Sequence, residues 1–428
     1  MKCDWQRIDN PQTVVNRVSN YPKELEGVFN TLKRLVDIPN APGFEQGMAR
    51  ELVDIFKPVC DSVHVDYMGN VYGKRQGAPD GPVIYCPAHI DSVSFIVEHI
   101  EPDGYIRFCQ LGIIPPYLPY GQRMVIVTPN GPITGVNGTQ AGHSHFNWGG
   151  AEGKYYPTEL VTTPMMDEQF IDVGAKSKEE ALEMGIRPGQ QIVYDRDLRW
   201  LGDGSTGMIT ARGLDDKVGL VVLIETLKEL EGKEIYPTVY MVGASQEEIG
   251  CRGAGSAGIV LDADLCVGVD GTISEAGPQT NKGFGAGDSP NITLSEVATS
   301  VGEGVYISVN DMAWGCMAGL MGNQKINEKL IDVASKRDIK YAVEGNMAYV
   351  SSDPCAVQHV GFGGTPSVTL KVPIRYTHGP VEVCSLYDSI EAIKLLTGFV
   401  EDLDSSFDLS FVDIPEADKG PRKNRKCY

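Results

Sequence analysis

Apolar residues recur along the chain with two different periods, and these periods predict its secondary structure. From Asn20 to Val36, and again from Glu45 to Phe56, they return every three or four positions, which predicts two amphipathic helices. Short apolar runs then follow at 63–67, 71–74 and 83–87, and they predict strands. Helices that alternate with short strands indicate an α/β layer structure.

The pattern changes after Asp91. From about Ser94 to Tyr194, short strand-like runs are separated by Gly, Pro and Asn turns, which predicts a small β-barrel or sandwich inserted into the α/β chain. A capping box at Ser177 and Glu180, followed by a glycine stop at Gly185, predicts one short helix near its end.

The α/β pattern resumes at Gly213. The predicted helices and strands of this part are Asp216–Leu230, Thr238–Gly243, Leu265–Asp270, Glu328–Ser335, Ser367–Val372 and Leu386–Glu401. We expect 288–304 to be an exposed, irregular excursion and 413–428 to be a polar, basic tail that stays mobile.

Composition limits the classes of partner. The formal net charge is -20 with a pI near 4.8, which argues against nucleic acid and against an anionic membrane surface. The first residues contain no apolar signal-peptide core, and no apolar run approaches the length of a membrane span, so we expect a cytoplasmic protein. The ten cysteines are scattered singly, which predicts reduced, mostly buried thiols, among them Cys86, Cys109 and Cys266.

The stretch V-I-Y-C-P-A-H-I-D, Val83 to Asp91, is the starting point for chemistry. It predicts a buried strand that ends with His89 and Asp91 on one face, where a carboxylate can support a histidine that binds a metal ion. Further acidic residues and a histidine end other strands or begin helices: Asp215, Glu247, Glu248, Asp270 and His378. Because ligands bind at the carboxyl ends of strands in α/β sheets, we expect these side chains to converge.

Two imidazoles and three carboxylates suit a divalent ion such as zinc, cobalt or manganese. A bridging carboxylate allows two such ions to lie roughly 3.5–4 Å apart with a shared water. Of the adjacent Glu247 and Glu248, one can coordinate while the other acts as general base. Each piece alone also has a structural explanation: helix capping for Asp215 and Asp216, a solvated helix start for the glutamates, a core position for His378. The combination favours the metal site.

Several of these motifs resemble those of a known family. H-I-D, G-L-D-D-K-V-G, Q-E-E-I-G-C-R-G-A, V-D-G-T and R-Y-T-H-G-P-V-E-V, in this order, are similar to the M42 family of dinuclear metallo-aminopeptidases, which includes the tetrahedral and glutamyl aminopeptidases. The resemblance extends from about Val28 to Val400, with flanking matches at A-P-G-F-E, D-Y-M-G-N and I-D-V-G-A-K-S-K-E-E-A.

The resemblance implies a three-layer α/β/α metallopeptidase domain, residues 1–93 and 200–412, interrupted by a β-rich dimerisation domain, residues 94–199. It implies two divalent metal ions per subunit, most often zinc. Asp215 would bridge them; His89 and Asp270 would complete one shell, and Glu248 and His378 the other. Glu247 would be the general base, acting on a metal-bridging water, and Asp91 would support His89. The implied activity is removal of N-terminal residues from short peptides, by a homo-oligomer that is a dimer or a dodecamer.

Some positions depart from the family pattern. Ser92 stands where the family usually has Glu, and S-S-D-P-C-A near Asp353 replaces a more typical G-G-T-D-A. The His-rich stretch 141–150, with His143 and His145, and the excursion 288–304 are also unusual. These changes leave the substrate open: an amidase that acts on a small non-peptide amide, held by donors such as His143, His145 or Arg375, and a non-catalytic assembly scaffold remain alternatives.

Overall fold

The computed structural model describes residues 21–138, 146–147, 156–157, 165–274, 299–311, 319–345, 351–361 and 363–412. The predictions for His143 and His145, for most of the 288–304 excursion and for the 413–428 tail lie outside these ranges.

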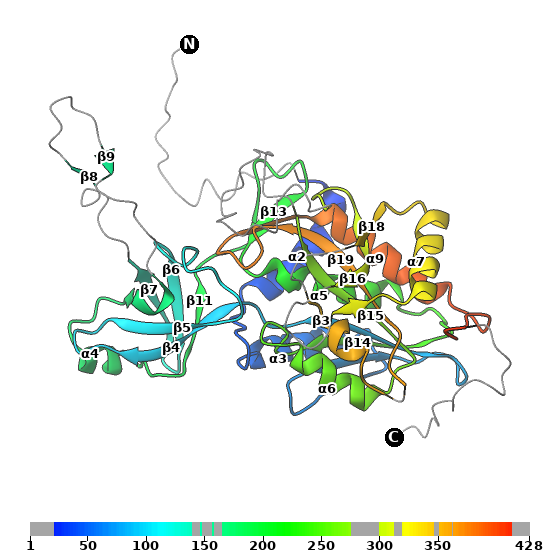
Figure 1. Ribbon diagram of the computed structural model, residues 1–428, viewed down its shortest axis with the longest axis horizontal. Helices are drawn as coiled ribbons and strands as arrows, with labels where there is room; N and C mark the ends of the chain where they lie inside the picture. Colours follow the sequence, from blue (N-terminus) through cyan, green and yellow to red (C-terminus); the bar gives the residue numbers. More distant parts are fainter. Residues whose placement is uncertain are drawn as a thin grey trace, which may run out of the picture.

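A mixed β-sheet forms the centre of the larger domain (Figure 1). Its described strands, in spatial order, are β1 (Ser62–Val65), β2 (Val71–Arg75), β14 (Thr238–Ala244), β3 (Val83–His89), β15 (Leu265–Ile273), β19 (Ser367–Arg375), β20 (Glu382–Ser385), β13 (Met208–Ala211) and β12 (Arg199–Trp200). A branch from β19 consists of β16 (Val305–Asp311), β17 (Leu320–Met321) and β18 (Tyr341–Gly345). The four central strands β14, β3, β15 and β19 are parallel, so their carboxyl ends meet at one edge of the sheet.

Helices cover both faces of this sheet. One face carries α2 (Glu26–Val36), preceded by the 3₁₀ turn η1 (Lys23–Leu25), together with α3 (Gln46–Phe56), α5 (Leu214–Glu229), α7 (Gln324–Lys336) and α9 (Leu386–Glu401); the other carries α6 (Arg252–Leu261) and α8 (Pro354–Val357). Alternation along β3 shows why: Ile84 and Cys86 pack into the core with α5, whereas Tyr85 packs with α6 and α8. A strand buried on both faces needs the uniformly apolar run that the sequence shows.

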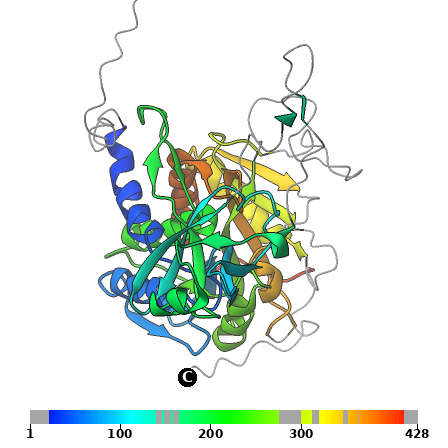
Figure 2. The same ribbon diagram turned by 90° about the vertical axis from the view of Figure 1, so that its left-hand side faces the viewer.

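The inserted domain is a small closed barrel, at the left of Figure 1 and nearest the viewer in Figure 2. Around the barrel the strands are β10 (Ile171–Asp172), β5 (Ile106–Leu111), β4 (Ser94–Ile100), β11 (Gln191–Tyr194), β6 (Arg123–Thr128) and β7 (Gly131–Asn137). It also contains η3 (Met166–Glu168) and α4 (Lys178–Glu183), and a separate pair of short strands, β8 (Phe146–Asn147) and β9 (Tyr156–Pro157), belongs to the same insertion. The predicted fold class, α/β with an inserted barrel-like domain, is confirmed.

Local capping explains where the elements begin and end. The Ser177 hydroxyl accepts the N–H of Glu180 at the start of α4, as the capping box predicts. Helix α7 begins four residues before the predicted Glu328, because the Asn323 side chain caps the N–H groups of Lys325 and Ile326. Strand β1 ends at Val65, two residues earlier than predicted, because the chain turns around the Asp66 carboxylate.

One surface prediction is wrong, and the described end of a second segment, 299–304, is partly buried. Cys109, predicted to be buried, lies exposed on β5, where alternate residues face outward. The end of the predicted exposed excursion is held against the core: Thr299 is fully buried, and the Asp388 carboxylate on α9 accepts the N–H groups of Gly302 and Gly304 at 2.7 and 2.8 Å. Among the helices that the structure describes, none combines the length and the apolar character needed to cross a membrane.

Candidate metal centre

The carboxyl edge of the four parallel strands gathers the polar side chains. His89 ends β3, Asp270 lies near the end of β15, and the segment with Glu247 and Glu248 directly follows β14. His378 comes three residues after β19, in a left-handed backbone conformation with φ of 61°. The structure therefore brings these five side chains together, with Asp215 at the beginning of α5 between them.

His89 is almost completely buried and oriented by its own strand end. Its Nδ1 lies 3.0 Å from the backbone carbonyl oxygen of Asp91. Because a carbonyl oxygen only accepts, Nδ1 carries a proton, and Nε2 is the nitrogen that faces the carboxylates and can bind a metal ion when it gives up its own proton. This Nε2 lies 3.2 Å from Asp215 Oδ1, 3.8 Å from Asp270 Oδ1 and 4.0 Å from Glu247 Oε2. A histidine oriented in this way is prepared to bind a metal ion through Nε2.

His378 is oriented by a contact from the inserted barrel. Its Nδ1 lies 2.8 Å from the carbonyl oxygen of Ile113, in the loop between β5 and β6. Its Nε2 faces Glu248 Oε2 at 3.4 Å and Asp215 Oδ2 at 3.7 Å. The His378 side chain is 31% exposed, against 3% for His89, so the site opens to solvent on the His378 side.

Asp215 occupies the position between the two histidines. One of its carboxylate oxygens faces His89 Nε2 and the other faces His378 Nε2. Its backbone N–H donates to Glu382 Oε2 at 3.1 Å, while Glu382 Oε1 accepts the N–H of His378 at 2.9 Å. Glu382 thus ties the two loops together, and Asp215 has the arrangement expected of a shared ligand.

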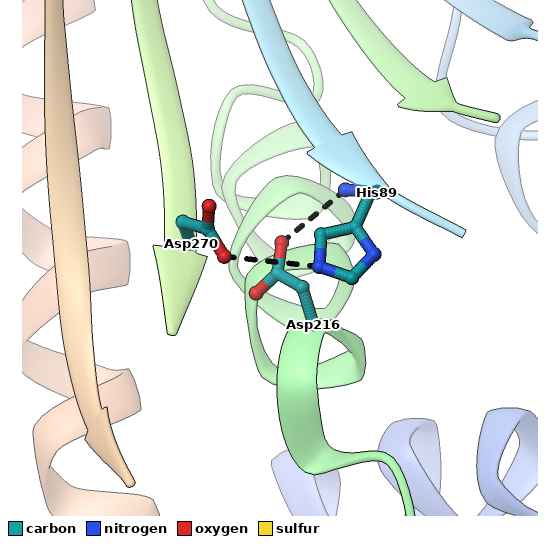
Figure 3. A group of neighbouring side chains, drawn as sticks. All are labelled: His89, Asp216 and Asp270. Carbon is teal, nitrogen blue, oxygen red and sulfur yellow. Dashed lines mark hydrogen bonds and ion pairs between the residues drawn. The ribbon is translucent and has the colours of Figure 1, made fainter. Parts of the chain in front are cut away.

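The neighbouring Asp216 is a second candidate ligand. Ligand atoms of His89, Asp216 and Asp270 all lie within 4.8 Å of one another (Figure 3). However, Asp216 Oδ1 accepts the N–H of Gly219 at 3.0 Å and Oδ2 accepts the N–H of His89 at 3.3 Å. Both Asp216 oxygens therefore already accept hydrogen bonds from backbone N–H groups, which is the helix-capping role that the sequence suggested for Asp215 and Asp216. Both oxygens of Asp215, in contrast, face imidazole rings.

Asp91 acts mainly on the segment with the two glutamates. Its Oδ1 accepts the N–H of Glu247 at 2.9 Å, and its Oδ2 accepts the N–H of Glu248 at 3.1 Å. The carboxylate also lies 3.5 Å from His89 Nδ1, but the hydrogen bond of that nitrogen goes to the Asp91 carbonyl. Fully buried Asp91 therefore fixes the backbone from which Glu247 and Glu248 project.

The electrostatics of the cluster fit divalent cations. Burial, together with neighbouring carboxylates, raises the pKa of Glu247, Glu248 and Asp270 above their ordinary values. Burial alone would lower the pKa of His89, but its hydrogen bonds and the surrounding negative charge raise it well above the usual range. The acidic groups thus crowd enough negative charge into a buried volume to favour cations, and imidazole with carboxylate is a suitable donor set for zinc, cobalt or manganese.

Sequence reasoning missed three supporting residues. Lys217 is completely buried and donates to Asn40 Oδ1, Ser92 Oγ and the Gly213 carbonyl at 3.3, 2.9 and 3.0 Å; burial lowers its pKa to about 7. Asn40 and Glu382 complete the set. The sequence did contain a signal for two of them, because each is a charged residue close to a proposed ligand. Lys217 follows Asp215 by two positions in G-L-D-D-K, and Glu382 follows His378 by four positions in H-G-P-V-E.

Ser92, the departure from the family pattern, is part of this support. Its hydroxyl donates to the backbone carbonyl of Asp215 at 3.1 Å and accepts from Lys217 and Asn40. Ser92 therefore links the strand that carries His89 to the backbone of Asp215 through neutral hydrogen bonds.

The chain is similar to known proteins over most of its length. The model of the family described as M42 glutamyl aminopeptidase matches residues 69–395. A lysyl aminopeptidase from Pyrococcus furiosus is 29% identical over 376 residues, 88% of this chain and 97% of that protein.

Solved structures show the same relationship. An aminopeptidase from the archaeon Desulfurococcus kamchatkensis is similar with a TM-score of 0.77 and 30% identity, over 89% of this chain and 96% of that one. The TET1 peptidase of Pyrococcus horikoshii, whose structure is described as assembling into a tetrahedron or a large octahedral shell, has a TM-score of 0.71 and 25% identity, over 88% of this chain and 100% of that one. With the family model matching most of its length, the chain belongs to the M42 glutamyl aminopeptidase family and is a hydrolase.

Proposed function

We propose that the chain is a dinuclear metal-dependent aminopeptidase that removes N-terminal residues from short peptides, with Glu247 as the general base. The observation that carries this proposal is the position of Asp215, whose two carboxylate oxygens face the Nε2 atoms of His89 and His378. A carboxylate between two oriented histidines can bind one ion through each of its oxygens, which suits a two-metal site.

The other ligands divide between the two sides of Asp215. His89 and Asp270 would hold one ion, and His378 and Glu248 the other, because each pair lies within 4 Å. Two divalent ions bound there would polarise the scissile carbonyl group and acidify the attacking water. We propose zinc as the metal, with cobalt and manganese as alternatives that suit the same donor set.

Glu247 would move the proton. Its Oε2 points toward His89 Nε2, into the space between the ligands, and Asp91 holds its backbone. Glu247 would accept a proton from the attacking water and deliver it to the leaving nitrogen, so that the carboxylate is regenerated after each turnover. Burial raises the pKa of its carboxyl group, which suits a group that must bind this proton firmly enough to transfer it.

The excess of carboxylates also favours a substrate with a free α-ammonium group. Acetylation of the N-terminus removes that positive charge, so an acetylated peptide should be hydrolysed at less than about one hundredth of the rate of the free peptide, as expected when a buried charge partner is lost. The measurement compares free and N-acetylated forms of the same dipeptides and aminoacyl anilides with metal-loaded enzyme. Equal rates would favour an amidase acting on small amides, and no hydrolysis of any compound would favour the scaffold.

We also propose that the chain assembles into homo-oligomers through the inserted barrel. The barrel domain exposes apolar side chains, among them Ile113 at 73% and Tyr117 at 54%, and the similar TET1 peptidase is described as forming closed shells. Light scattering at micromolar protein should give at least twice the 46.5 kDa chain mass. A mass of one chain would contradict the assembly proposal and leave the catalytic proposal standing.

A further inference from the structure

The proposed base has a neighbour that the mechanism does not use. The thiol of Cys251 lies 3.3 Å from Glu247 Oε1 and donates to it, while Glu247 Oε2 is the oxygen that faces His89. The two oxygens therefore have different surroundings. Cys251 is only 6% exposed, so solvent does not compete strongly for this hydrogen bond.

The backbone places this thiol on the carboxylate. The N–H groups of Gly250 and Cys251 donate to the carbonyl of Glu247 at 2.8 and 2.9 Å, which closes a tight turn before α6. Cys251 itself has a left-handed backbone with φ of 49°, an unusual conformation for a residue with a side chain. Because Asp91 also holds the N–H of Glu247, the backbones of donor and acceptor are both fixed.

Ionic interactions alone do not fix the Glu247 side chain. A charged His89 attracts the Glu247 carboxylate, but its Nε2 is 4.0 Å away, beyond hydrogen-bond distance, and the charges of Asp270, Glu248 and Asp353 repel the carboxylate. Both carboxylate oxygens of buried Asp353 lack a hydrogen-bond partner among the described residues, so Asp353 donates no hydrogen bond to the Glu247 carboxylate. Within the described part of the chain, the Cys251 thiol is the only hydrogen-bond donor to the Glu247 carboxylate.

We propose that Cys251 is a positioning residue: its thiol holds Glu247 Oε1, so that Oε2 is directed toward the space between the metal ligands. The inference rests on the proposed role of Glu247 as base. It assigns the thiol to orientation of the base, and neither to metal binding nor to covalent chemistry. Misplacement of a catalytic group lowers the rate of the chemical step more than it weakens substrate binding. Removal of the thiol should therefore lower kcat and leave KM nearly unchanged.

The kinetic test uses three variants. Cys251→Ala should lower kcat by about tenfold, with KM and metal content per chain within about twofold of the parent. Cys251→Ser should recover most of that loss, because a hydroxyl group donates from nearly the same place. Cys266→Ala is the matched control, since Cys266 is a fully buried thiol on β15 that does not contact Glu247, and its kcat should be unchanged. Equal loss in the Ala and Ser variants, or loss of metal in either, would overturn the inference.

A second readout does not depend on activity. The S–H stretching band lies in an infrared window with little other protein absorption, and Cys251→Ala identifies the band of this thiol by difference. Glu247→Ala should shift the band to higher frequency, because the thiol loses its acceptor; an unshifted band would overturn the hydrogen bond. Failure of the proposed function can be told apart from failure of this inference. If Glu247 is not the base, Glu247→Gln is fully active. If only the role of Cys251 is wrong, Glu247→Gln is inactive and Cys251→Ala is fully active.

Discussion

Glu247→Gln should retain both metal ions but lose turnover by roughly a hundredfold or more, the contribution typical of a general base. The glutamine has nearly the same volume, and its carbonyl oxygen can still accept the hydrogen bond from the Cys251 thiol. Its amide group, however, cannot take a proton from the attacking water. The expected result is a large fall in kcat with KM little changed. Steady-state kinetics, together with elemental analysis of the purified variant, measures both quantities.

Glu45→Gln is a suitable control for this experiment. Glu45 is also a buried glutamate beside the same turn, and its Oε1 accepts the N–H groups of Gly43 and Gln246 at 2.9 and 3.2 Å. A glutamine carbonyl oxygen can accept the same bonds, so turnover should stay within a few-fold of the parent. Normal turnover in Glu247→Gln would remove this residue from the mechanism.

Asp215→Ala should have the second large effect, which is loss of metal. The carboxylate lies between His89 and His378, so its removal takes a ligand from both proposed ions and leaves each with a pair of side chains. Elemental analysis after dialysis should find well under one ion per chain, and activity should fall accordingly. Two retained ions per chain would show that Asp215 is not the bridge.

Asp216→Asn separates this arrangement from the alternative ligand set. If Asp216 only serves the backbone N–H groups of His89 and Gly219, its asparagine variant should be less stable but should still bind two ions. A site built from His89, Asp216 and Asp270 requires the opposite result, because the substitution would replace an anionic ligand by a neutral one.

The sequence predicted the fold wherever the pattern was periodic and locally capped. Helix α9 occupies the predicted residues, because its apolar period is regular and the Ser385 side chain caps its first turn. Helix α6 was not predicted, since its sequence R-G-A-G-S-A-G-I-V-L is rich in glycine, and these glycines let it pack closely against Ser245 after β14 and against α8. The short strands β16, β18 and β20 carry little periodic signal, so tertiary pairing defines them.

The proposed metal ligands and the proposed base were also predicted from the sequence, because each stands close to a strand end or a helix start. Which atoms they contact could not be predicted. The hydrogen bond between His378 and the carbonyl oxygen of Ile113 joins residues 265 positions apart in the sequence, and it depends on how the barrel packs against the larger domain. Likewise, the sequence predicts that Asp91 supports His89, but it does not predict that the Asp91 carboxylate also accepts the backbone N–H groups of Glu247 and Glu248, which lie 156 and 157 positions away along the chain.

The central claim is that two metal ions share the Asp215 carboxylate. Anomalous diffraction from crystals of the zinc-loaded enzyme, measured on both sides of the zinc absorption edge, tests it most directly. The account predicts two peaks per chain, roughly 3.5–4 Å apart, one beside His89 and Asp270 and the other beside His378 and Glu248, with Asp215 between them. A single peak enclosed by His89, Asp216 and Asp270 would contradict it.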